Sequence, residues 1–147
     1  MRTGLACLLA GLACSAPAVA EDPAGAWEFR TDIVTKGCTI TGYMTIGIED
    51  PGTGERACEF VSSETCGPLD PEAVEMQQAC EVQFEGDYLL IRSEVLASLT
   101  EGRGIAGYLP DNFTVQPSGV GRMSGTWYDL NYADLVEFWR ARGGATS

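Results

Sequence analysis

The stretch that decides the fold is CTITGYMTIGI, residues 38–48, in which small or apolar residues alternate with polar ones. One face carries Cys38, Ile40, Gly42, Met44, Ile46 and Ile48. A period of two is the pattern of a β-strand that is buried on one face. The stretch ends at EDPGTG, residues 49–54, which is rich in turn-forming residues. This part of the chain therefore predicts a strand that enters a hairpin.

The same alternation continues along the chain. It predicts an opening strand near residues 26–30 and further strands near 58–62, 74–84, 89–95, 113–115, 123–127 and 136–138. The inward faces carry Ile40, Met44, Ile46, Phe60, Met76, Phe84, Leu89, Ile91, Phe113, Met123 and Trp127. Residues 97–107, with three glycines, are interpreted as a long loop. Residues 70–80 could instead form a helix, because Pro71 suits a first helical turn and EAVEMQQ has good helix propensity.

Eight strands with one apolar face predict an all-β fold, an eight-stranded antiparallel up-and-down barrel. Closing the sheet removes the exposed edge strands that promote aggregation. A two-sheet β-sandwich is the alternative. The length of 127 residues suits one domain, so residues 21–147 are expected to form a single domain.

The first 20 residues have the pattern of a secretory signal peptide. Arg2 precedes an uncharged apolar run over residues 4–16, and an A-x-A site ends at Ala20. A lipoprotein acylated at Cys14 is the alternative. The protein is thus expected to be periplasmic or secreted, without membrane insertion.

Four cysteines follow the signal segment, namely Cys38, Cys58, Cys66 and Cys80. An even number in an exported domain predicts two disulfides. A zinc site is not expected, because the chain has no histidine and the cysteines lack C-x-x-C spacing. Folding the first hairpin about Gly52 favours pairing 38–66 with 58–80, while pairing 38–58 with 66–80 remains open.

Charge and composition exclude several functions. After loss of Arg2 the chain has eight basic and 21 acidic residues, a net charge of −13. Such a domain repels phosphate backbones, so no nucleic-acid partner is expected. Nucleophilic catalysis lacks its usual histidine base. Of the candidate acids for acid–base catalysis, Glu49, Asp50 and Glu59 fall in turns or on outward faces, and Glu64 faces inward. Asp111-Asn112 after Pro110 is ordinary turn chemistry. We expect no enzyme activity, no cofactor and no metal.

Gly25-Ala26-Trp27 on the first strand and Arg140 near the end of the last resemble the calycin signature, a G-x-W motif with an arginine packed over the tryptophan. Calycins include the lipocalins and the bacterial inhibitors of secreted metalloproteases. The resemblance implies a non-catalytic binding barrel whose partner is an unknown protein or a small apolar ligand. It also implies, as one alternative, a periplasmic protease inhibitor that uses its N-terminal tail, residues 21–24, and as another a carrier of small apolar ligands.

Overall fold

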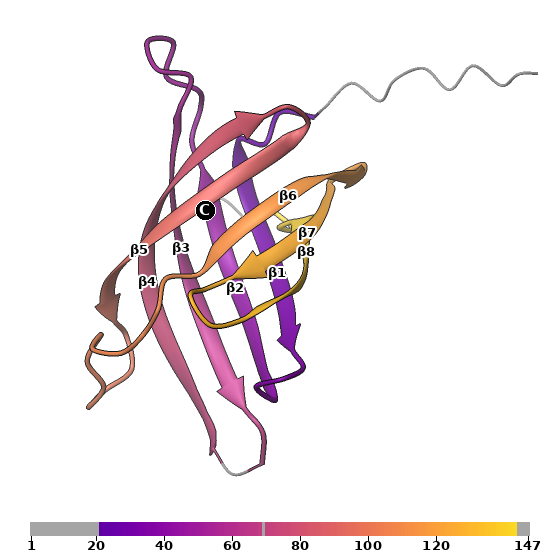
Figure 1. Ribbon diagram of the computed structural model, residues 1–147. Coiled ribbons are helices and arrows are strands. Elements are labelled where there is room, and N and C mark those ends of the chain that lie inside the picture. The colour runs from indigo at the N-terminus through magenta and orange to yellow at the C-terminus, as the bar shows by residue number, and fades with distance from the viewer. Residues whose placement is uncertain (1–20, 69, 144–147) are drawn as a thin grey trace, which may run out of the picture.

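The computed structural model describes residues 21–68 and 70–143, and the proposed signal peptide lies outside them. These residues form one closed barrel of eight antiparallel strands, each hydrogen-bonded to the next, as Figure 1 shows. The strands are β1 (Gly25–Ile33), β2 (Cys38–Ile46), β3 (Arg56–Cys66), β4 (Asp70–Glu85), β5 (Tyr88–Ser98), β6 (Asn112–Gly119), β7 (Arg122–Tyr128) and β8 (Ala133–Arg140). The predicted all-β barrel is confirmed, and the alternative of a two-sheet β-sandwich is wrong.

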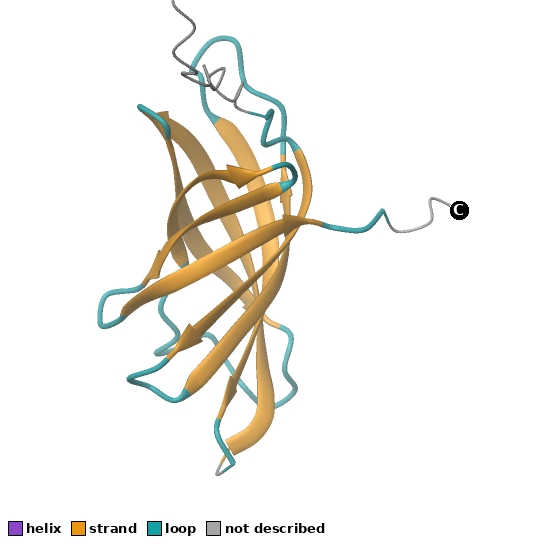
Figure 2. Ribbon diagram, turned by 90° about the vertical axis from the view of Figure 1, so that its right-hand side faces the viewer, coloured by secondary structure: helices purple, strands orange, loops and turns teal. Residues whose placement is uncertain are grey.

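Closure comes from β1, which pairs with β2 on one side and with β8 on the other. The segment that could have been helical is a strand, because β4 begins at Asp70 and runs to Glu85. The expected loop over residues 97–107 was placed slightly too early, since β5 continues to Ser98 through its pairing with Met76. The described residues contain no helix long and apolar enough to span a bilayer, and Figure 2 shows strands and loops alone.

Both predicted disulfides form. Cys38 is bonded to Cys66 between β2 and β3, and Cys58 is bonded to Cys80 between β3 and β4. In each case the two cysteines are direct partners in the strand register, so neighbouring strands bring the sulfur atoms together. Two such bonds indicate an oxidising, extracytoplasmic environment.

The inward residues form one hydrophobic core that runs the length of the barrel. Two residues assigned to inward faces are not buried in the core: Ile48 lies outside the strands, whereas Phe84 keeps the inward side of β4 opposite Leu89. Phe84 is 46% exposed and Ile48 is 83% exposed. Ile48 lies beyond the end of β2, and Phe84 lies beyond Val82, the last residue of β4 that pairs with β3. Alternation continues in the sequence there, but the wall that would cover these side chains has ended.

The seam between β5 and β6 is the shortest in the barrel. Only Leu89, Leu90 and Ile91 pair across it, with Val115, Thr114 and Phe113. Beyond these pairs the β4–β5 and β6–β7 hairpins separate toward their turns (Figure 1). The barrel is therefore closed by a short seam, and at one end of this seam the two neighbouring hairpins lie apart.

Candidate binding site

The middle of the barrel is filled by aromatic side chains. Phe29, Phe60, Phe113 and Phe138 are all buried, and the ring centroids in contact are 5.0–5.8 Å apart. Most of these contacts are edge-to-face, the arrangement that aromatic rings favour. An eight-stranded barrel is just wide enough for such filling. A ligand site must therefore be sought toward the ends of the barrel.

A buried polar cluster lies beside this aromatic layer. The Asp111 carboxylate, 1% exposed, accepts hydrogen bonds from the Trp127 indole, from the Gln78 amide and from the Tyr108 hydroxyl. Burial raises the pKa of Asp111 above its ordinary value, because it disfavours the charged form more strongly than these hydrogen bonds favour it. The carboxylate is satisfied on both oxygens, which is typical of a structural buried acid.

Sequence reasoning placed Asp111 in a turn and missed its burial. The signal was present, because Asp111 has the same parity as Phe113 and Val115 and directly precedes β6. All three are buried. The alternation thus begins one residue before the strand, and local turn chemistry at Pro110-Asp111-Asn112 concealed it.

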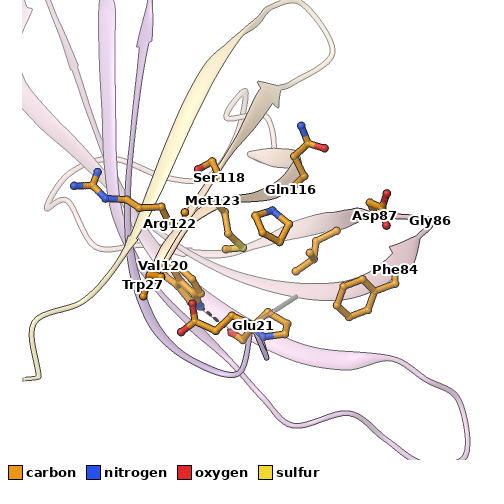
Figure 3. A pocket seen from close by; sticks show the side chains of 14 residues that line it. Glu21, Trp27, Phe84, Gly86, Asp87, Gln116, Ser118, Val120, Arg122 and Met123 are labelled. Carbon is orange, nitrogen blue, oxygen red and sulfur yellow. Dashed lines mark hydrogen bonds between the residues drawn. The ribbon is translucent and has the colours of Figure 1, made fainter. Parts of the chain in front are cut away.

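A hollow lies where the β5–β6 seam ends, between the β4–β5 and β6–β7 turns (Figure 3). Its volume is about 940 Å³. Buried Trp27, Leu89 and Met123 form its floor, and Phe84 stands on one wall. Its other lining residues are Glu21, Pro23, Gly86, Asp87, Gln116, Pro117, Ser118, Gly119, Val120 and Arg122.

The hollow follows from the local structure of its walls. Gly86 and Gly121, with φ of 61° and 63°, lie in the tight turns of the β4–β5 and β6–β7 hairpins, which extend beyond the β5–β6 pairing. A positive φ is strained for any residue with a Cβ, which explains glycine at these turns. Phe84 is exposed because it lies on the part of β4 that extends beyond its pairing with β3. Phe84 thus faces inward opposite Leu89, as the alternation predicts, and forms a wall of the hollow instead of part of the packed core.

The segment before β1, residues 21–24, folds across this end of the barrel. Pro23 is buried, and its carbonyl oxygen accepts a hydrogen bond of 2.7 Å from the Trp27 indole. The Glu21 carboxylate accepts one of 2.9 Å from the Gly121 amide. Asp22 forms an ion pair of 3.2 Å with Arg56, whose side chain is only 7% exposed. The segment thus closes the barrel end and forms one side of the hollow.

The three residues of the calycin-like signature meet at the same end. The Arg140 guanidinium lies over the Trp27 ring, 4.1 Å from its centroid, and donates a hydrogen bond to the Ala24 carbonyl. Gly25 has a φ of 117°, and a Cβ at this position would lie 2.9 Å from Nη1 of Arg140. A side chain at residue 25 would therefore disturb both the backbone and the stacked arginine.

The opposite mouth of the barrel offers a smaller space of about 200 Å³. It lies beside the ion pair between Lys36 and Glu64, and Tyr108 and Cys66 also line it. Glu64 is the inward acid of the sequence pattern, and the structure pairs it with a cation. Among the described residues, Cys38, Glu64 and Cys66 place possible metal ligands close together. The two sulfur atoms are bonded to each other, so they are not available as thiolate ligands.

No protein-family model matches this chain, and no curated protein matches it in sequence. Among solved structures the chain is similar to one described as "Structure of a redesigned beta barrel, mFAP1, bound to DFHBI". The TM-score is 0.51 at 11% identity, and the match covers 80% of this chain and 94% of that one. At this identity the likeness shows the fold alone, a barrel of the same general plan.

Proposed function

We propose that this protein is an exported, non-catalytic binding protein whose hollow between the β4–β5 and β6–β7 turns takes a small apolar ligand. The observation that carries the proposal is the hollow itself. Its volume of about 940 Å³ falls within the range of small-molecule pockets, about 300–1,000 Å³. Its floor and walls offer an indole, a thioether, a phenyl ring and aliphatic groups.

Two further features support this site over the barrel centre. The four packed phenylalanines occupy the space that an internal ligand would need. Phe84 is 46% exposed although it is a large apolar side chain, and it faces the hollow in Figure 3. Covering its ring with an apolar ligand would remove that surface from water, which is favourable.

The proposed absence of catalysis rests on the groups present at the site. The buried acid with a raised pKa, Asp111, does not line the hollow, and its oxygens are occupied by hydrogen-bond donors. The lining combines apolar side chains with a few exposed polar groups, and the chain contains no histidine to act as a base. Export is supported by the A-x-A site at Ala20 and by the two disulfides.

The test is a titration with N-phenyl-1-naphthylamine, a neutral dye whose fluorescence rises in apolar surroundings. Phe84→Ser should weaken dye binding about tenfold, because one apolar wall is lost. Tyr88→Ser is the matched control, since Tyr88 is on the same hairpin and is also 46% exposed, yet does not line the hollow. Equal binding by both variants and the unaltered protein would overturn the site, and no binding by any of them would overturn the proposal.

A further inference from the structure

The charges around the hollow bear on the kind of ligand it accepts. Two acids, Glu21 and Asp87, and one base, Arg122, line it. In Figure 3 the Arg122 guanidinium points away from Phe84 and from the centre of the hollow. The Glu21 carboxylate lies 3.4 Å from Arg140 and accepts from the Gly121 amide, so its charge is partly balanced. Asp87, at the exposed β4–β5 turn, places its negative charge at the mouth.

The charge of the whole domain has the same sign. Its net charge of −13, from eight basic and 21 acidic residues, makes the surrounding potential negative. A field of this kind attracts cations to a cleft and repels anions. A ligand with a carboxylate or sulfate group would have to approach against this potential.

The aromatic groups of the hollow differ in their availability to a cation. One face of Trp27 is already covered by the Arg140 guanidinium, 4.1 Å from the ring centroid. Among the described residues, Phe84 makes no ring contact of the kind that joins the core phenylalanines, and almost half of its surface is exposed. A positive group within about 6 Å of an aromatic face is attracted by the ring quadrupole. Phe84 therefore offers an exposed aromatic ring of the hollow to a cation, and it lies on the same hairpin as Asp87.

We infer that the ligand of this hollow is an apolar molecule that carries a positive charge, such as an alkyl or aryl ammonium compound. Its apolar part packs on Leu89, Met123 and the edge of Trp27. Its charged end lies at the mouth, between the Phe84 ring and the Asp87 carboxylate. This inference rests on the proposed function and adds the charge class of the ligand.

Three ligands of equal chain length test it: decyltrimethylammonium, decanol and decanoate, each used below its aggregation concentration. They compete with N-phenyl-1-naphthylamine for the intact secreted protein at low salt. We expect the ammonium compound to bind about tenfold more tightly than decanoate, with decanol between them. The difference should shrink as salt is added, because ions screen exposed charges.

Asp87→Asn should reduce the preference for the cation by about threefold or more while leaving decanol binding unchanged. Glu101→Gln is the matched control, because it removes the same charge from the exposed β5–β6 loop, at the other end of β5. An equal loss in both variants would mean that only the overall charge acts, which overturns the placement of the ligand's charged end beside Asp87. Equal affinity for the ammonium compound and decanoate would overturn the inferred charge class of the ligand. If the dye still binds in that case, the proposed function stands.

Discussion

The Arg140 guanidinium covers the Trp27 indole at 4.1 Å, although the two residues come from the last and first strands of the chain. The two residues are also direct partners in the β1–β8 register, so the strand pairing that closes the barrel brings their side chains together. The same guanidinium donates to the carbonyl oxygens of Ala24 and Asp22. A single side chain thus connects the closing seam, the end of the core and the segment before β1.

Truncation of Trp27 should therefore be costly. Trp27 is 2% exposed, and removal of a buried tryptophan side chain costs about 3–5 kcal/mol. Arg140→Ala should cost less, through lost stacking and hydrogen bonds. Trp139→Ala should cost less than Trp27→Ala, because Trp139 is only partly buried and its indole donates to Glu28 on the outer face. Urea denaturation measures all three, and near-zero effects for both Trp27 and Arg140 would contradict this account of the barrel end.

The disulfides should be complete in the secreted protein. Mass spectrometry without reductant should show an N-terminus at Glu21, no free thiol, and peptides linked as Cys38–Cys66 and Cys58–Cys80. Each bond closes a loop of more than 20 residues and should contribute about 3 kcal/mol by restricting the unfolded chain. Reduction should lower the denaturation midpoint clearly. A free thiol at two of the four cysteines would contradict the structure.

Gly42 should not tolerate a side chain. A Cβ there would lie 2.1 Å from Cζ of Phe29 and 2.8 Å from the Val61 carbonyl oxygen. Gly42→Ala should therefore destabilise by about 1–3 kcal/mol, because the packed phenylalanines must shift. Gly104→Ala is the control, since a Cβ at that loop position meets nothing within 4 Å. Equal stability of the two variants, measured by urea denaturation, would show that the aromatic layer is loosely packed.

The buried acid should give stability a characteristic pH dependence. Because burial raises the folded-state pKa of Asp111 above 3.8, the folded protein keeps this proton at pH values where the unfolded chain has lost it. The free energy of unfolding should therefore fall as the pH rises above about 3.8, and this contribution should level off above the folded-state pKa.

Asp111→Asn cannot titrate and should lack this contribution. The difference between the unaltered protein and the variant, measured by urea denaturation across this pH range, isolates it from the other acids. Asp32→Asn serves as a control of opposite sign, because hydrogen bonds from Arg30 and Thr39 lower the pKa of Asp32. A constant difference at all pH values would mean that Asp111 titrates normally in the fold.

Deletion of residues 21–24 should destabilise the barrel rather than free a functional tail. It removes the acceptors of Trp27 and Arg140 and one of the two ion-pair partners of Arg56, a loss on the order of 3 kcal/mol. The protease-inhibitor hypothesis instead requires this segment to extend into a protease cleft. We expect the intact protein not to slow a serralysin-type protease. Inhibition that disappears on deletion, with the fold retained, would support the inhibitor hypothesis over ours.

The sequence by itself determined the strands, the fold class and the number of disulfides. These follow from local patterns, because a period of two marks each half-buried strand and an even cysteine count marks an oxidised domain. The segment over residues 70–80 shows where such patterns compete. The segment has good helix propensity, but it forms a strand because it pairs with β3 on one side and with β5 on the other, which completes the barrel wall.

Only the tertiary structure decided the disulfide pairing, the burial of Asp111 and the position of the hollow. The pairing depends on which residues stand opposite each other across a turn, and parity alone left two solutions open. Phe84 continues a perfect alternation, yet it is exposed because β3 ends before it. Where a neighbouring strand stops is a property of the whole sheet, and no local period in the chain encodes it.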